Sequence, residues 1–125
     1  MLKKFSLAAA VVIACASSMA FAAPAKVADS AKGKVLVDSK GMTLYTFAKD
    51  SAGKSVCNGQ CLANWPAFTA SAAAKDADGY TVITRDDGSK QWAYKGQALY
   101  TWVKDSQPGD ITGDGVGGNW NLAKP

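Results

Sequence analysis

Cys57 and Cys61 are the residues of this chain whose type and spacing bear most directly on chemistry. Four positions apart, they suit one helical turn or a compact loop, within the Cα separation that a disulfide needs. Of the three cysteines, these two remain if residues 1–22 are removed as a signal peptide, and an exported chain with an even number of cysteines typically holds them as disulfides. The sequence therefore predicts a disulfide that staples a loop. The alternative is a redox-active pair, although reactive thiols usually have the spacing Cys-x-x-Cys.

Three aspartates, Asp105, Asp110 and Asp114, share one Gly-rich segment, 105–119. Carboxylate oxygens suit calcium, but these intervals differ from the alternating ligands of an EF-hand loop. We therefore expect no metal site, and keep Asp110 and Asp114 as candidate ligand-loop residues. Asp50 and Asp105 are each expected to accept backbone N–H bonds at the end of a strand.

The chain contains no histidine and no glutamate. This composition excludes a Ser-His-Asp or Cys-His catalytic arrangement and removes the imidazole ligands of most zinc sites. Paired aspartates can serve a glycosidase, but nothing in the sequence places two of them across a cleft. The sequence thus favours a non-catalytic protein with no metal and no cofactor.

Aromatic residues recur at corresponding places along the chain. Large rings of this kind are more often core residues than stacking platforms for a ligand, because each buries a large apolar area. If any act on a ligand, Trp65 and Trp120 are the candidates, since they end the two most variable loops. The set comprises Tyr45, Phe47, Trp65, Trp92, Tyr100, Trp102 and Trp120.

These residues belong to two copies of one pattern. The stretch Gly41 to Ser51 returns as Gly96 to Ser106, and Asn64-Trp65 returns as Asn119-Trp120 at the same offset. A duplicated supersecondary unit is the best explanation of an offset that stays constant over this length. The loops at 50–64 and 105–119 differ between the copies, and divergent loops on a retained scaffold are where function usually lies.

Each copy is predicted to be an antiparallel β-meander. Short runs rich in β-branched and aromatic residues alternate with Gly-containing turns. We expect an all-β fold of two homologous meander repeats packed pseudo-symmetrically, with Gly-rich loops and little helix. The expected strands are 34–37, 42–47, 80–84, 91–94 and 99–102.

The turns also predict a register. Two-residue loops at 87–88 and 95–96 would place Ile83 opposite Trp92, and Trp92 opposite Leu99. A two-residue loop at 40–41 would pair Val37 with Leu44 in the first copy.

The chain divides into a leader and one domain. Residues 1–22 have the basic start, the apolar run and the small-x-small cleavage site of a signal peptide. Residues 23–32 look like a flexible lead. Residues 33–125 are expected to form one domain, with repeat 1 at about 33–69 and repeat 2 at about 80–125, joined by an Ala-rich linker.

Cys15 allows a second interpretation of the leader. Val12-Ile13-Ala14-Cys15 is similar to a bacterial lipobox, in which the cysteine carries lipid. The predicted location is therefore periplasmic or secreted, with a membrane-anchored lipoprotein as the alternative. Any membrane contact would come through that anchor. The net charge of +4 comes from scattered lysines, which argues against a nucleic-acid partner.

The chain resembles the bacterial family of secreted repeats of unknown function, predicted lipoproteins marked by the motif Tyr-x-[Phe/Trp/Tyr]-x-x-Asp. The motif occurs as Tyr45-x-Phe47-x-x-Asp50 and as Tyr100-x-Trp102-x-x-Asp105, and the surrounding residues from about 34 to 124 fit the pattern. These include Arg85-x-Asp87-Gly88 before Gln91, and Cys57-x-x-x-Cys61-x-x-x-Trp65-Pro66. The resemblance implies an envelope location and no particular activity.

Three functions stay open at this point. The first is an exported, non-catalytic envelope protein that binds an unknown partner or small ligand through its loops. The second is a periplasmic thiol–disulfide redox participant using Cys57 and Cys61. The third is a structural envelope or stress protein without a ligand.

Overall fold

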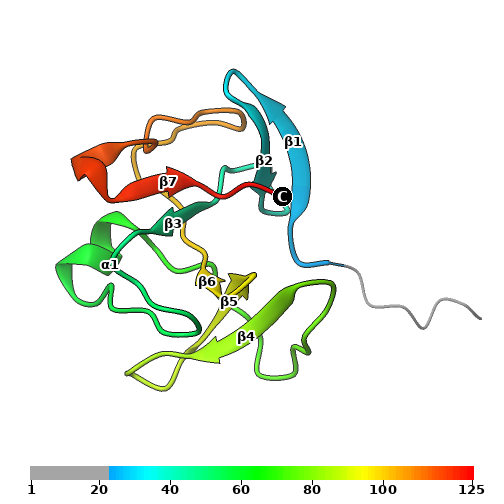
Figure 1. Ribbon diagram of the computed structural model, residues 1–125, viewed down its shortest axis with the longest axis vertical. Coiled ribbons are helices and arrows are strands. Elements are labelled where there is room, and N and C mark those ends of the chain that lie inside the picture. Colours follow the sequence, from blue (N-terminus) through cyan, green and yellow to red (C-terminus); the bar gives the residue numbers. More distant parts are fainter. Residues whose placement is uncertain (1–22) are drawn as a thin grey trace, which may run out of the picture.

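Two hairpins, each followed by a further strand segment, set the fold (Figure 1). The computed structural model describes residues 23–125; the predicted signal peptide and Cys15 lie outside them. The antiparallel strands and the short helices confirm the all-β prediction. In chain order the elements are β1 (Lys26–Ser30), β2 (Gly33–Val37), β3 (Tyr45–Phe47), α1 (Gln60–Asn64), β4 (Tyr80–Thr84), β5 (Lys90–Tyr94), β6 (Gln97–Ala98), the 3-10 turn η2 (Val116–Gly118) and β7 (Trp120–Leu122).

Strand β1 replaces most of the expected flexible lead. It pairs antiparallel with β2 along its whole length, so the prediction for 23–32 is wrong for residues 26–30. Its one large apolar side chain, Val27, is 53% exposed. An edge strand held by backbone hydrogen bonds needs no apolar alternation, and charged residues on it discourage pairing with another chain. Repeat 1 is therefore a three-stranded meander like repeat 2.

The two repeats distribute their turn residues differently. The first turn encloses two residues in repeat 1 and three in repeat 2, and the second turn reverses this order. As a result, residues of β1 correspond to residues of β4 in the way that Lys26 corresponds to Thr81. Residues of β2 correspond to residues of β5 at an offset one residue larger, in the way that Leu36 corresponds to Trp92. The closing pairs are Ser30–Gly33 and Asp38–Met42 in repeat 1, and Arg85–Ser89 and Tyr94–Gln97 in repeat 2.

The predicted register is right at one turn and wrong by one residue at two. The two-residue loop at 95–96 is confirmed, and Leu99 N donates to Trp92 O at 3.0 Å. Ile83, however, pairs with Gln91 rather than with Trp92. In repeat 1 the error is the same kind, because Val37 pairs with Thr43 and not with Leu44.

Glycines explain these two errors. Gly41 and Gly88 each end a three-residue loop with a positive φ, +85° and +88°. The backbone N–H of each glycine donates to the residue three positions earlier. A type I turn followed by a left-handed glycine is the usual three-residue hairpin loop.

The repeats interlock about Tyr45 and Tyr100. Tyr45 N donates to Tyr100 O at 2.8 Å, and Tyr100 N donates to Tyr45 O at 3.0 Å. Tyr45 also pairs with Leu122 at the end of repeat 2, and Tyr100 pairs with Ala67 at the end of repeat 1. A pseudo-twofold axis therefore passes between the two tyrosines, and each repeat contributes its last residues to the sheet of the other.

The same axis relates two corners where three chain segments meet. In each corner three residues bond to one another in a ring of backbone hydrogen bonds of 2.9–3.0 Å. The corners confirm that Leu36, rather than Val37, is the counterpart of Trp92. They are formed by Leu36, Leu44 and Ala123, and by Trp92, Leu99 and Phe68.

Candidate functional site

The tyrosine and the aspartate of the repeated motif bond across the repeats. Tyr45 Oη donates to Asp105 Oδ2 at 2.6 Å, and Tyr100 Oη donates to Asp50 Oδ2 at 2.6 Å. Both tyrosine side chains are fully buried. Each motif is thus completed by the aspartate of the other copy.

The second oxygen of each carboxylate holds a variable loop. Asp50 Oδ1 accepts the backbone N–H of Val56 at 2.8 Å. Asp105 Oδ1 accepts the backbone N–H and the hydroxyl of Thr112, at 3.0 and 2.6 Å. The aspartates therefore tie the start of each loop to the tyrosine of the opposite repeat.

Burial governs the protonation of these pairs. It raises the pKa of Tyr45 and of Tyr100 well above the usual value, and the hydrogen bond that each makes to a carboxylate raises it further. Burial also raises the pKa of Asp50, against the opposing hydrogen bonds from Tyr100 and Val56. Both phenols accordingly remain hydrogen-bond donors at neutral pH.

Four aromatic rings form a continuous stack between the repeats. Successive centroids lie 4.2, 3.8 and 4.0 Å apart, and the two central rings are inclined by 3°. The outer rings are the motif aromatics, and each stacks on the tryptophan of the other repeat. The order is Phe47, Trp120, Trp65, Trp102.

Trp65 and Trp120 were the candidates if any aromatic residue contacts a ligand. In the structure they are packed inside the stack, as was expected for the aromatic set as a whole. Their side chains are 4% and 5% exposed. The edges of Tyr45 and Tyr100 pack against them, at centroid distances of 5.3 and 5.1 Å. At Gly113 an added Cβ would lie 2.8 Å from the Trp65 ring, so no larger residue fits without displacing the stack.

The aspartates of the Gly-rich loop have separate partners. Asp110 Oδ2 accepts the backbone N–H groups of Ser106 and Gln107, at 2.8 and 3.2 Å. Asp114 forms an ion pair with Lys32 at 2.6 Å. Within residues 23–125 no three His, Cys, Asp or Glu side chains are grouped so as to hold a metal ion.

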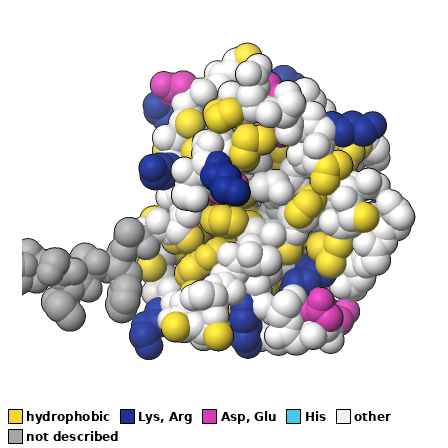
Figure 2. All heavy atoms as spheres, turned by 180° about the vertical axis from the view of Figure 1, so that it is seen from behind, with side chains coloured by type: hydrophobic (Ala, Val, Ile, Leu, Met, Phe, Trp, Pro, Cys, Tyr) yellow, Lys and Arg dark blue, Asp and Glu magenta, His cyan; other side chains and the backbone are white. Residues whose placement is uncertain are grey.

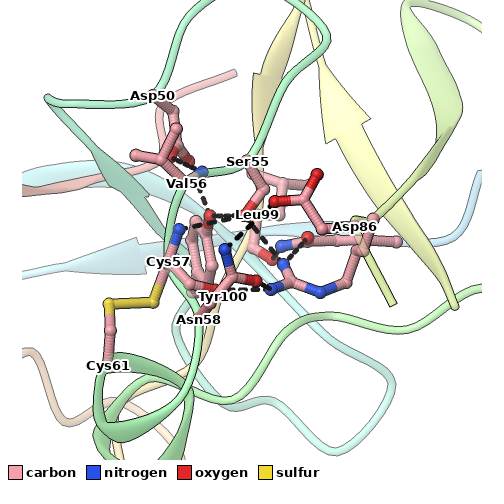
Figure 3. Close-up of a disulfide and its surroundings, with 11 residues drawn as sticks. Asp50, Ser55, Val56, Cys57, Asn58, Cys61, Asp86, Leu99 and Tyr100 are labelled. Atoms are coloured by element: carbon pink, nitrogen blue, oxygen red, sulfur yellow. Dashed lines mark hydrogen bonds between the residues drawn. A yellow bond between two sulfur atoms is a disulfide. The ribbon is translucent and has the colours of Figure 1, made fainter. Parts of the chain in front are cut away.

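The disulfide lies at the surface end of a buried polar cluster (Figure 3). Cys57 and Cys61 are bonded, with their Cα atoms 5.2 Å apart. Cys57 is fully buried and Cys61, at the start of α1, is partly exposed. The bond thus fixes the loop that runs over Ser55 and Tyr100.

Arg85 fills the centre of that cluster. Its side chain is 4% exposed. Nη1 donates to Ser55 Oγ at 2.7 Å and to Gln91 Oε1 at 2.6 Å. Nη2 donates to Asn58 Oδ1 at 2.8 Å and to the carbonyl of Cys57. Among the buried side-chain nitrogen and oxygen atoms of residues 23–125, Nε of Arg85 alone has no hydrogen-bond partner.

Arg85, Gln91 and Ser55 are the site residues that sequence reasoning did not single out. Arg85 and Gln91 appeared only as part of the family resemblance, without a role. An arginine at the end of a strand usually signals a solvent-exposed position. The available signal was the asymmetry of the repeats, since the offset that relates Gly41 to Gly96 also relates Ser30 to Arg85.

The surface of residues 23–125 carries apolar and basic side chains without a pocket. Figure 2 shows hydrophobic side chains in several separate groups, with lysine and arginine side chains between them. The described part of the chain contains no pocket. It also contains no helix of the length and hydropathy that a membrane crossing requires.

The fold and the cluster define a duplicated, disulfide-stapled β-module whose repeats complete each other's motif. The family described as a secreted repeat of unknown function matches residues 26–69 and 81–124. The chain belongs to this family, as its motif suggested, and the family is described as secreted. No curated protein and no solved structure was found to match the chain.

Proposed function

We propose that this is an exported, non-catalytic envelope protein that binds a partner or small ligand through its two variable loops. The observation that carries the proposal is the use of the motif side chains, which are engaged with one another between the repeats. The loops at 50–64 and 105–119 differ between the repeats, and the first holds the disulfide. In bacteria the protein would be periplasmic or secreted, or anchored through Cys15, and the mass of the mature N-terminus distinguishes these cases.

The arrangement of the loops supports this proposal. Figure 1 shows α1 and the end of the Gly-rich loop on the side of the molecule away from β1, whereas Asp114 of that loop pairs with Lys32 in the β1–β2 turn. In the disulfide loop the backbone of Val56 is held by Asp50, while its side chain is 46% exposed. A rigid loop that presents an apolar side chain loses little conformational entropy on binding.

A thermal-shift panel tests the proposal. Ca²⁺, Cu²⁺, haem and soluble sugars are added separately to the purified protein. We expect at least one to raise the melting temperature, because binding to the native state at 100 times Kd contributes about 2.7 kcal/mol. Val56→Ser should then reduce the shift.

Val27→Ser is the matched control, because it removes a similarly exposed valine from β1, outside the loops. It should leave the shift unchanged. Equal effects of the two substitutions would contradict binding through the disulfide loop. A flat response across the panel would contradict binding of these ligand classes.

The redox alternative makes a different prediction for the disulfide. Because Cys57 is buried and the bond fixes the loop over Arg85, we expect a structural bond, with a reduction potential below about −300 mV. Equilibration with defined thiol–disulfide buffers measures it. A value of about −200 mV, within the range of catalytic disulfides, would favour the redox function instead.

A further inference from the structure

The contacts between the repeats are nearly the same when the two repeats are exchanged. The tyrosine–aspartate bonds, the ring stack and the Tyr45–Tyr100 pairing each have a symmetric counterpart. Because these surfaces are alike, a repeat could use them to pair with a second copy of itself. Such like-with-like pairing between chains would join molecules in an uncontrolled way.

One position in the interface is not symmetric. Val56 N bonds Asp50 as Thr112 N bonds Asp105. The residues that precede them, Ser55 and Ile111, are therefore counterparts. Ser55 belongs to the Arg85 cluster, whereas Ile111 packs against an apolar cluster.

The strands opposite these loops differ in the same sense. Arg85 and Gln91 of repeat 2 are polar and buried. By the offsets that relate β1 to β4 and β2 to β5, their counterparts in repeat 1 are Ser30 and Val35. Val35 lies in the apolar cluster against which Ile111 packs. One half of the interface is thus polar and the other half apolar.

Pairing of like repeats would mix these two halves. Two copies of repeat 2 would set Arg85 against Ile111 and bury a charge away from Ser55 and Asn58. Burying a charge without its partners is strongly unfavourable. Two copies of repeat 1 would leave the carbonyl of Cys57 without its arginine donor, and an unsatisfied buried acceptor also carries a desolvation cost.

We propose that Arg85, Gln91 and Ser55 specify the pairing of unlike repeats, both within one chain and wherever two copies of the chain exchange repeats. In the exchanged dimer, repeat 1 of each copy pairs with repeat 2 of the other. The connecting segment 71–79 contains no helix or strand and is largely exposed, which suits it to act as the hinge. Specificity comes from penalising the wrong partner as well as from favouring the right one.

A shortened linker tests the exchange. Ala70 N bonds Lys90 O beside β5, and Tyr80 pairs with Tyr94 at the other end of that strand. From the strand spacings these ends are about 16 Å apart. Deletion of residues 71–78 leaves only two Cα steps of about 3.8 Å each. The two repeats of one chain can then no longer pair, and we expect a discrete dimer with an intact tryptophan signal in near-UV circular dichroism. A folded monomer would overturn the exchange.

The triple substitution Ser55→Ile, Arg85→Ser and Gln91→Val tests the specificity. Each new residue is the one that stands at the equivalent place in the other repeat, so the buried charge is removed and the two halves of the interface become alike. In the shortened chain we expect the discrete dimer to be lost to a range of larger assemblies in light scattering after size exclusion. Val27→Ser in the same shortened chain is the control and should remain a dimer. A discrete dimer of the triple variant would overturn the assigned specificity.

Refolding of the full-length chains keeps the test independent of the deletion. At high protein concentration the unsubstituted chain should give monomer and some dimer, and the triple variant should add species larger than a dimer. Identical distributions of the two chains would contradict the proposal.

Discussion

Trp65→Ala should lower the free energy of unfolding by about 3–5 kcal/mol, the usual cost of removing a large buried ring. Trp65 is a central ring of the stack, with Trp120 at 3.8 Å and Trp102 at 4.0 Å, and the edge of Tyr45 also packs on it. Its removal leaves a cavity and eliminates three aromatic contacts, made with rings from both repeats. Urea unfolding, followed by far-UV circular dichroism, measures the loss.

Trp92→Ala is the matched control for this prediction. Trp92 is only partly buried and lies outside the four-ring stack, in edge contact with Tyr80. Its removal should cost clearly less than that of Trp65. Equal losses, or a loss below about 1 kcal/mol for Trp65→Ala, would contradict a stack that holds the repeats together.

Asp105→Ala should cost roughly 2–3 kcal/mol, because it leaves the buried Tyr45 hydroxyl and two donors of Thr112 without their acceptor. Tyr45→Phe should cost somewhat less, since it removes the bond to Asp105 and the longer bond that Tyr45 Oη accepts from Gly113 N at 3.1 Å, but leaves both bonds from Thr112 in place. In a double-mutant cycle the two substitutions should be non-additive by about 1 kcal/mol or more, as expected for residues in direct contact.

The informative comparison in this cycle is Asp105 with the tyrosine of its own motif. Tyr100 bonds to Asp50 and not to Asp105, so Tyr100→Phe and Asp105→Ala should be nearly additive. Coupling of Asp105 to Tyr100 in place of Tyr45 would show that each motif closes within its own repeat and would refute the cross-repeat arrangement.

The duplication made much of this fold predictable. The offset that relates Tyr45 to Tyr100 also relates Trp65 to Trp120, and it shows which residues are equivalent. Equivalent aromatic residues in both copies indicate shared packing. The hairpin at 95–96 followed from its Lys-Gly turn. The disulfide was predicted from the two cysteines that remain when the expected signal peptide is removed.

The register was missed because turn length and sequence offset are separate quantities. Each repeat contains one two-residue and one three-residue turn, in opposite order, so the offset returns to its first value after both turns. Because the offset between the two copies is the same before and after β2, comparison of the sequences concealed the one-residue shift within that strand. The glycine itself does not distinguish the two turn lengths, since Gly96 of a two-residue turn has φ +87°, close to the values of Gly41 and Gly88; the residue before it does, because Lys95 also has a positive φ, +51°.

The cross-repeat bonds were beyond the reach of the sequence for a different reason. An internal repeat identifies Asp50 with Asp105, but the same pattern fits bonds within each repeat and bonds between them. The role of Arg85 was hidden for a related reason. Its burial depends on Ser55 and Asn58, which are distant in sequence and become its partners only when the repeats meet.

The exchange of aspartates between the motifs also bears on descent. A unit whose tyrosine finds its acceptor only in a companion has no complete core by itself. A single repeat would therefore need a second identical copy to bury this tyrosine–aspartate pair. Joining the two units in one chain frees them to differ, as they do at Arg85 and Ser30.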